Sequence, residues 1–205
     1  MMWRWTTARE RAALLKNWFN LCQANGEELA KIVTTEQGKP LAQARAEVGY
    51  GNSFIEWFAE ETKRINGNVI LHLLLPKEEI EDAEIAFCSK VIPPVNNKNH
   101  QMMIKQPIGV AGIITPWNFP NAMITRKLGA ALASGCTVVC RPAEDTPLSA
   151  LAVITLAEEA GFPKGVINIV TSDRSNASSI GKAICKSPKV RPTMTILNTR
   201  AIHFL

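Results

Sequence analysis

The sequence predicts an α/β protein in which amino-terminal helices precede part of a doubly wound parallel sheet. Apolar residues such as Leu14, Leu15 and Trp18 recur at helical spacing within residues 1–66. Residues 107–185 instead alternate short apolar runs with helical segments, which is typical of parallel strands joined by right-handed crossovers. The 205 residues are 46% hydrophobic and 20% charged, and this composition favours a folded core over disorder.

Three amino-terminal helices are expected. They cover Thr7 to Asn25, residues 27–37 and residues 41–65. Thr7 and Glu10 form a capping box, in which each side chain satisfies an amide of the first helical turn. Gly38-Lys39-Pro40 ends the second helix, because Gly closes helices and Pro cannot continue one. The large aromatic residues of the third helix, such as Phe54 and Trp57, are interpreted as core.

The α/β region is expected to contain three strands, each followed by a helix. The strands cover Ile108–Ile114, Thr137–Cys140 and Val166–Val170, and the helices begin at Pro120, Pro147 and Ser175. Ligands of such sheets bind beyond the carboxyl ends of the strands, so the turns after Ile114 and Cys140 are the candidate sites. The sequence has no G-x-G-x-x-G segment, so the usual dinucleotide-binding turn is missing.

The first candidate turn is Thr115-Pro116-Trp117-Asn118-Phe119-Pro120. Its two prolines restrict the backbone, and Trp117 offers a flat wall to a ligand. Asn118 lies at the entrance to a helix, where its side-chain amide either caps the helix or donates to a ligand. Capping is the more frequent role of Asn at such a position, so the residues by themselves favour it.

The second candidate turn runs from Arg141 to Pro147 and pairs a cation with a carboxylate three residues later. Arg141 and Glu144 together could hold a ribose or a phosphate beyond the end of the strand. The alternative interpretation is a solvated charged turn that binds nothing, and both interpretations stay open at this point.

Several classes of partner are disfavoured. The net charge is +5, but the basic residues are scattered, so no nucleic acid is expected as a partner. The longest uncharged stretch, Gln106–Thr125, contains prolines and polar residues and would make a poor membrane span. Cys136 and Cys140 flank a predicted strand that holds them about 13 Å apart, so no metal site is expected. The five cysteines form no disulfide framework, which fits a reducing compartment.

Five segments resemble the NAD(P)-dependent aldehyde dehydrogenase family. Three match general motifs of the family: Ile114–Pro120, Glu36–Pro40, and Arg141–Glu144, the last with Arg where the family has Lys. Two others, Ser53–Glu61 and Met123–Lys127, resemble the succinate-semialdehyde dehydrogenases within that family. The motifs occur in the family's order, and the resemblance covers residues 5–68 and 93–191.

The resemblance implies a Rossmann-like NAD-binding fold and a role for each matching residue. Asn118 would donate its amide to the oxyanion that forms when a cysteine thiolate attacks an aldehyde. Arg126 would bind the distal carboxylate of the substrate. The cofactor would contact Thr115, Pro116, Trp117, Arg141 and Glu144, the last two at the adenosine ribose.

NAD is expected as the cofactor in preference to NADP. Glu144 would accept hydrogen bonds from the ribose hydroxyls, whereas it would repel a 2′-phosphate. Arg141 suits a phosphate, but its long side chain can swing away, whereas the repulsion by Glu144 is hard to avoid at contact distance. Truncation of the cofactor domain is expected to weaken binding of either cofactor.

The sequence also departs from the family pattern. It contains neither the Glu-Leu-Gly-Gly segment that carries the family's general base nor the Gly-Gln-x-Cys segment that carries its nucleophile. Leu71–Ile92 is interpreted as an insertion, because the dipeptide Val69-Ile70 recurs as Val91-Ile92. The expected organisation is a single incomplete aldehyde dehydrogenase domain without its catalytic part. Its segments are helices at 1–68, an insertion at 69–92, a partial cofactor-binding region at 93–191 and a divergent tail at 192–205.

The resemblance implies oxidation of succinate semialdehyde to succinate, a step of 4-aminobutyrate breakdown. The chain alone is expected to be inactive, because the nucleophile and the base are missing. The alternative is a non-catalytic binding or assembly module that pairs with full-length subunits, and a homo-oligomer also stays open. Met1–Arg11 carries charges where a secretory signal would be apolar, so a cytoplasmic location is expected by default. A mitochondrial location stays open for a eukaryotic parent.

Overall fold

The computed structural model describes residues 3–65, 68–70, 101–103 and 105–192. The chain forms two compact units, one of Met1–Lys63 with Pro107–Leu205 and a smaller one of Arg64–Gln106. In the smaller unit, β1 (Asn68–Ile70) pairs antiparallel with β2 (Gln101–Met103). The segment interpreted as an insertion, residues 71–92, lies outside the described residues.

The amino-terminal helices begin and end largely where the sequence predicts. They are η1 (Trp3–Trp5), α1 (Ala8–Ala24), α2 (Gly26–Gln37) and α3 (Leu41–Glu61), and η2 (Thr62–Arg64) follows α3. The capping box is confirmed, because the Glu10 amide donates to Thr7 Oγ1 at 3.2 Å and the Thr7 amide to Glu10 Oε2 at 2.7 Å. Gly38 ends α2 with φ of 78°, a left-handed conformation that glycine adopts readily.

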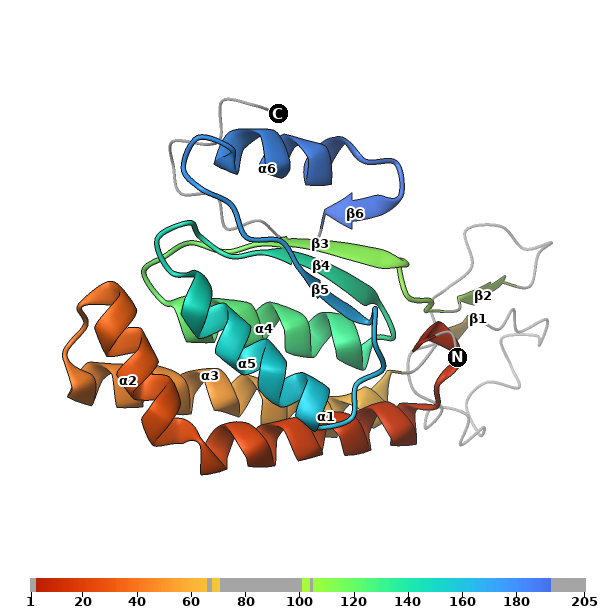
Figure 1. The fold of residues 1–205 in the computed structure, drawn as a ribbon. Helices are drawn as coiled ribbons and strands as arrows, with labels where there is room; N and C mark the ends of the chain where they lie inside the picture. Colours follow the sequence, from red (N-terminus) through yellow and green to blue (C-terminus); the bar gives the residue numbers. More distant parts are fainter. Residues whose placement is uncertain (1–2, 66–67, 71–100, 104, 193–205) are drawn as a thin grey trace, which may run out of the picture. The chain divides into compact units, whose positions relative to one another are not determined.

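A parallel sheet forms the centre of the larger unit, in the order β5-β4-β3-β6. Its strands are β3 (Val110–Ile114), β4 (Thr137–Arg141), β5 (Ile167–Ile169) and β6 (Val190–Pro192). Helices α4 (Pro120–Ala133) and α5 (Pro147–Glu159) lie on one face of the sheet, and α6 (Ala177–Lys186) lies on the other (Figure 1). The chain therefore changes to the other face of the sheet after β5, which confirms the doubly wound, Rossmann-like arrangement. The point where the strand order reverses, the topological switch point, lies between β3 and β6.

The prediction of three strands was wrong, because β6 adds a fourth. This strand is only three residues long and has no apolar run, so its pairing with β3 depends on tertiary context. Val190 lies opposite Val110 and Pro192 opposite Gly112. β6 is the outermost strand on this side of the described sheet, and Pro192, its last residue, is tolerated at such a position. The first residue of the segment interpreted as a tail thus belongs to the sheet.

Helix α1 packs against the layer formed by α4 and α5. Trp18 is fully buried, and its indole nitrogen donates to the carbonyl of Val153 on α5 at 3.0 Å. Arg11 Nε donates to the carbonyl of Ala133 at the end of α4 at 2.9 Å. The core role expected for Trp57 was wrong, because its side chain is 59% exposed and Ile55 fills the core instead.

Helices α3 and α4 run side by side in the same direction and approach closely at two glycines. A side chain at Gly51 of α3 would meet Asn121 Oδ1 and, at 3.2 Å, the Cα of Ala122 on α4. A side chain at Gly129 of α4 would come within 2.8 Å of the Phe58 ring on α3. These positions need glycine because the neighbouring helix occupies the space of a methyl group.

The close approach predicts opposite effects of the same substitution at two positions of α3. Gly51→Ala should destabilise the chain by about 1–3 kcal/mol, because the methyl group overlaps the α4 backbone. Gly49→Ala should stabilise it by about 0.5–1 kcal/mol, because Gly49 is exposed with nothing within 4 Å and Ala favours helix. Denaturant unfolding followed by circular dichroism measures both, and equal effects at the two positions would contradict the packing.

Candidate functional site

The turn between β3 and α4 lies at the carboxyl edge of the sheet. The amide of Thr115 donates to the carbonyl of Arg141 at 3.1 Å, so this turn starts beside the end of β4. Thr115 is buried, whereas Trp117, Asn118 and Phe119 are exposed. The structure thus presents three consecutive side chains of the first candidate turn at the edge where such sheets bind ligands.

Residues at the end of α2 hold the backbone of this turn. Gln37 Nε2 donates to the carbonyls of Trp117 at 3.1 Å and Asn118 at 2.9 Å. The ammonium group of Lys39 donates to the carbonyl of Asn118 at 3.1 Å and lies 4.3 Å from the centre of the Phe119 ring. The segment Glu36–Pro40 therefore acts as a brace for the first candidate turn.

Glu47 of α3 caps helix α4. Its carboxylate is buried, with 3% of the residue exposed, and it accepts from the amide of Asn121 at 2.9 Å. It also forms an ion pair with Lys39. Capping by Asn118, the role that the residues favoured, is wrong: Phe119 occupies the N-cap position and makes no side-chain capping bond. The side-chain amide of Asn118 therefore does not serve as the cap of α4.

A second glutamate caps helix α5 in the same way. Glu36 of α2 accepts from the amide of Ser149 at 3.0 Å and from its hydroxyl at 2.6 Å. Both helices that follow β3 and β4 therefore begin on a carboxylate supplied by the amino-terminal helices. An anionic ligand placed at either helix start would meet that negative charge, so neither start is a favourable place for a phosphate.

The second candidate turn is joined to the loop after β5. The guanidinium of Arg141 donates to Glu144 Oε2 at 2.5 Å and to the hydroxyl of Ser172 at 3.2 and 3.3 Å. Arg141 is 8% exposed, so the interpretation as a solvated charged turn is wrong for this residue. Arg141 is held by Glu144 on one side and by Ser172 on the other.

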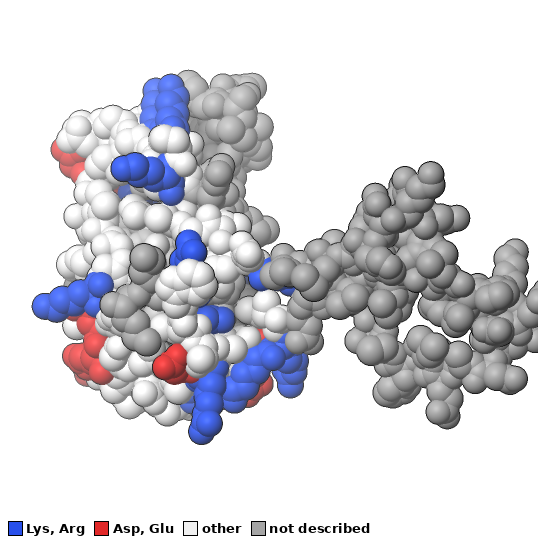
Figure 2. All heavy atoms as spheres, turned by 90° about the vertical axis from the view of Figure 1, so that its right-hand side faces the viewer, with Lys and Arg blue, Asp and Glu red and all other residues white. Residues whose placement is uncertain are grey.

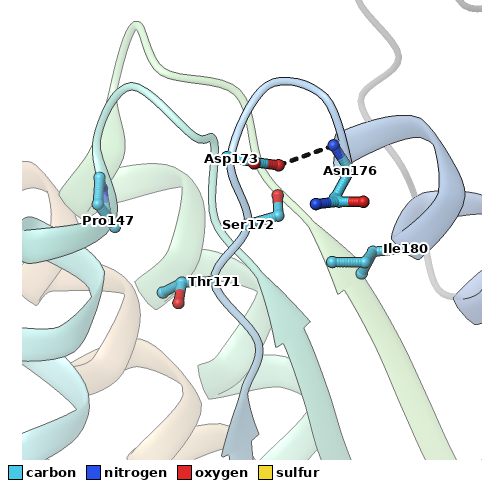
Figure 3. A pocket seen from close by; sticks show the side chains of 6 residues that line it. All are labelled: Pro147, Thr171, Ser172, Asp173, Asn176 and Ile180. Atoms are coloured by element: carbon cyan, nitrogen blue, oxygen red, sulfur yellow. Dashed lines mark hydrogen bonds between the residues drawn. The ribbon is translucent and has the colours of Figure 1, made fainter.

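A cavity of about 640 Å³ opens between the start of α5 and the start of α6. Its lining comes from both helices and from the loop between β5 and α6 (Figure 3). The lining residues are Pro147, Thr171, Ser172, Asp173, Asn176 and Ile180. Ser172 links the cavity to Arg141, and the volume is within the range of small-molecule sites.

Asp173 organises the rim of this cavity. Its Oδ1 accepts from the amide of Asn176 at 2.8 Å (Figure 3). Its Oδ2 accepts from the hydroxyl of Ser175 at 2.9 Å. The backbone hydrogen bond from Asn176 and the hydroxyl of Ser175 lower the pKa of Asp173 below its usual range. The start of α6 is therefore capped from its own loop, unlike the starts of α4 and α5.

Arg126 lies on α4, two turns beyond Asn118. Its guanidinium contacts the thioether of Met123 at 3.1 Å and lies 5.7 Å from the centre of the Phe54 ring on α3. Phe54 in turn packs edge-on against Tyr50, with ring centres 4.7 Å apart. No ion pair among the described residues includes Arg126. It is a partly buried cation in largely apolar surroundings.

The described cysteines do not offer an activated nucleophile. Burial raises the pKa of Cys22 on α1 and of Cys140 on β4 to about 12 each. Cys136 is also buried, and only Cys185 of the four described cysteines is exposed. Within the described ranges, no cluster of His, Cys, Asp or Glu could hold a metal ion.

Charged side chains are spread over the surface of the larger unit. On the face seen in Figure 2, Lys and Arg occur from one end to the other, with Asp and Glu among those at the lower end. Exposed pairs such as Arg45–Glu27 and Arg174–Asp145 join opposite charges. No helix in the part of the chain that the structure describes is long and apolar enough to cross a membrane.

Comparison with known proteins decides the family. The sequence profile of the aldehyde dehydrogenase family matches residues 1–196. The chain belongs to the aldehyde dehydrogenase family. Mitochondrial succinate-semialdehyde dehydrogenase of Homo sapiens is 48% identical over 188 residues, which cover 92% of this chain and 31% of that protein. Succinate-semialdehyde dehydrogenase [NADP(+)] of Escherichia coli K12 is 49% identical over 189 residues, 92% of this chain and 34% of that protein.

Solved structures agree with this placement. PnpE in complex with nicotinamide adenine dinucleotide superposes with a TM-score of 0.75 at 32% identity, over 92% of this chain and 34% of that one. This aldehyde dehydrogenase chain thus spans about a third of the length of the relatives it matches.

Sequence reasoning missed four residues of the site. They are Gln37, Lys39, Glu47 and Ser172. Gln37 and Lys39 lie in a segment that matched the family, but no role was assigned to them there. Glu47 and Ser172 lie outside every motif, and nothing in the sequence indicates that one accepts from α4 and the other from Arg141.

Burial of the cysteines predicts a selective pattern of alkylation. Iodoacetamide at pH 8 should modify Cys185 and leave Cys22 and Cys140 intact, because a thiol with a pKa of about 12 is ionised in about one molecule in ten thousand. Peptide mapping by mass spectrometry measures this, with protein unfolded in guanidinium as the control in which all react. Rapid alkylation of Cys140 in the folded chain would contradict the assignment.

Proposed function

We propose that the chain forms the cofactor-facing and carboxylate-binding part of an aldehyde dehydrogenase site of the succinate-semialdehyde type, with NAD as cofactor. The proposal is carried by the surroundings of Arg126. This partly buried cation lies among apolar side chains and belongs to no ion pair among the described residues. A desolvated cation is stabilised by an anion that accepts charge-assisted hydrogen bonds. The carboxylate at the far end of a semialdehyde is such an anion.

Asn118 is proposed as the oxyanion donor. Its side chain is exposed at the carboxyl edge of the sheet, while Gln37 and Lys39 hold its backbone. A donor held in place before the reaction stabilises charge that develops on the aldehyde oxygen without reorganisation during the step. NAD, when bound, would accept the hydride from the aldehyde carbon.

The cavity beside α6 is proposed as the adenosine end of the cofactor site. Glu144 uses Oε2 for its bond to Arg141, which leaves Oε1 to accept from ribose hydroxyls. Ser172 lines the cavity and touches Arg141, so the ribose contacts and the cavity are continuous. Glutamate carboxylates lie at the starts of α4 and α5, and Asp173 lies at the rim of the cavity. The cavity is therefore proposed for the uncharged adenosine of the cofactor and not for its phosphates. The residues present therefore fit a dinucleotide.

The first test concerns activity and substrate class. The 205-residue polypeptide alone should form no reduced nicotinamide from succinate semialdehyde, because the family's nucleophile and base segments are absent from its sequence. A chimaera, in which this chain replaces the matching third of the E. coli enzyme, should be active. In that chimaera Arg126→Ala should lower kcat/KM for succinate semialdehyde by about 100-fold, as expected for loss of a charged partner worth about 3 kcal/mol.

Two controls make this test specific. Butanal has the same chain length without the carboxylate, so Arg126→Ala should leave its kcat/KM nearly unchanged. Arg45→Ala removes an exposed arginine that is paired with Glu27 on α2 and should change the kcat/KM of neither substrate. Equal losses for both aldehydes in Arg126→Ala would show a structural role and overturn the proposed substrate class.

The second test concerns the cofactor. The named E. coli relative uses NADP(+), yet the chimaera should prefer NAD, since its ribose site comes from this chain. Glu144→Ser should shift the preference toward NADP by about tenfold or more, because it removes a repulsion of about 1–4 kcal/mol and frees Arg141 for a phosphate. Glu158→Ser, at an exposed position near the end of α5, is the matched control. If the chimaera with Glu144 intact prefers NADP, the proposed NAD preference is wrong.

A further inference from the structure

We propose that the ion pair between Lys39 and Glu47 is a positioning device, which sets the turn Thr115–Phe119 and thereby the place of the Asn118 side chain. The inference rests on the proposed function, since it explains how the oxyanion donor is held. Neither residue is expected to touch a substrate or a cofactor, so both would be positioning residues.

The ion pair forms contacts with the chain on both sides of the Asn118 side chain. Lys39 donates to the carbonyl of Asn118 and packs on the Phe119 ring, which fixes the entry to the helix. Glu47 accepts from the amides of Asn121 at 2.9 Å and Ala122 at 3.4 Å, which fixes the first turn of α4. Because Lys39 and Glu47 also bind each other, these two fixed points form a single unit.

Burial separates this pair from the exposed ion pairs among the described residues, although Arg141 and Glu144 are also largely buried. The side chains of Lys39 and Glu47 are 12% and 1% exposed, whereas those of Lys31 and Glu28 are 54% and 68% exposed. An exposed pair samples many geometries and contributes little, but a desolvated pair must keep its partners. Glu47 without Lys39 would be a buried charge held only by backbone amides.

The prolines, the Thr115 bond to Arg141 and the Gln37 bonds also hold the turn, but none of them ties it to Glu47. Phe119, at the N-cap position of α4, supplies no side-chain cap. Gln37 shares the Asn118 carbonyl with Lys39 but reaches nothing on the far side of the turn in the described contacts. Loss of Lys39 should therefore release the Asn118–Phe119 peptide while the sheet and α4 remain folded.

The test is ¹⁹F NMR of the full chain labelled with 5-fluorotryptophan, without aldehyde or cofactor. Trp117 reports on the turn and fully buried Trp18 reports on the core, and Trp117→Phe assigns the turn signal. Lys39→Met should shift and broaden the Trp117 signal and leave that of Trp18 in place. Lys39→Arg, which keeps the charge, should restore a single sharp Trp117 signal, and Lys31→Met should change neither.

Amide exchange provides the second readout. In Lys39→Met the amides of Asn121 and Ala122 should exchange at least about tenfold faster, while the amide of Val153 in the core of α5 keeps its rate. If Lys39→Met fails to fold, Glu47→Gln replaces it as the test variant in both measurements. This substitution removes the charge but keeps an acceptor for the Asn121 amide. An unchanged Trp117 signal, or equal changes at Trp117 and Trp18, would overturn the inference.

Both readouts are independent of catalysis. A failure of the Arg126 test would remove the proposed substrate class and leave the ¹⁹F result standing. A failure of the ¹⁹F test would remove the positioning role and leave the Arg126 and Glu144 results standing.

Discussion

Glu47 lies on α3 but accepts its hydrogen bonds from the first turn of α4, so the amino-terminal helices and the sheet region share one buried charge. A buried carboxylate needs several partners, and here they come from α4 and from Lys39 after α2. The segments that meet at Glu47 must therefore keep one arrangement. The turn that carries Asn118 lies at their junction and takes its conformation from it.

The same use of carboxylates shapes the proposed cofactor site. In a doubly wound sheet, the helix start after the first strand is the usual place for a phosphate. Here Glu47 and Glu36 occupy the starts of α4 and α5, and the available cavity lies further along, beside Ser172 and the start of α6. The absence of a glycine-rich turn is therefore compatible with a cofactor site elsewhere at this edge of the sheet.

Sequence alone was sufficient for features that depend on local interactions. Helix starts at Ala8, Pro120 and Pro147, and the strands around Gly112 and Val139, follow from caps, prolines and apolar runs. Strand β6 could not be predicted, because three residues that include Arg191 and Pro192 have no strand signal without their partner β3. The role of Asn118 was misjudged for a similar reason. Its competitor for the helix start, Glu47, is 71 positions away, and only tertiary structure brings the two together.

One register between α3 and α4 connects the two ends of the proposed substrate site. Successive turns of α3 present Glu47, Gly51 and Phe54. Glu47 and Gly51 meet the first turn of α4 at Asn121 and Ala122, and Phe54 meets its next turn at Arg126. A slip by one turn would bring Glu47 against the middle of α4, where no free amides exist, and would remove the ring beneath Arg126. The glycines at the contact allow the helices to approach closely enough for both interactions. The proposed oxyanion turn and the proposed carboxylate receptor are therefore not independent features, because a single helix packing sets the distance between them.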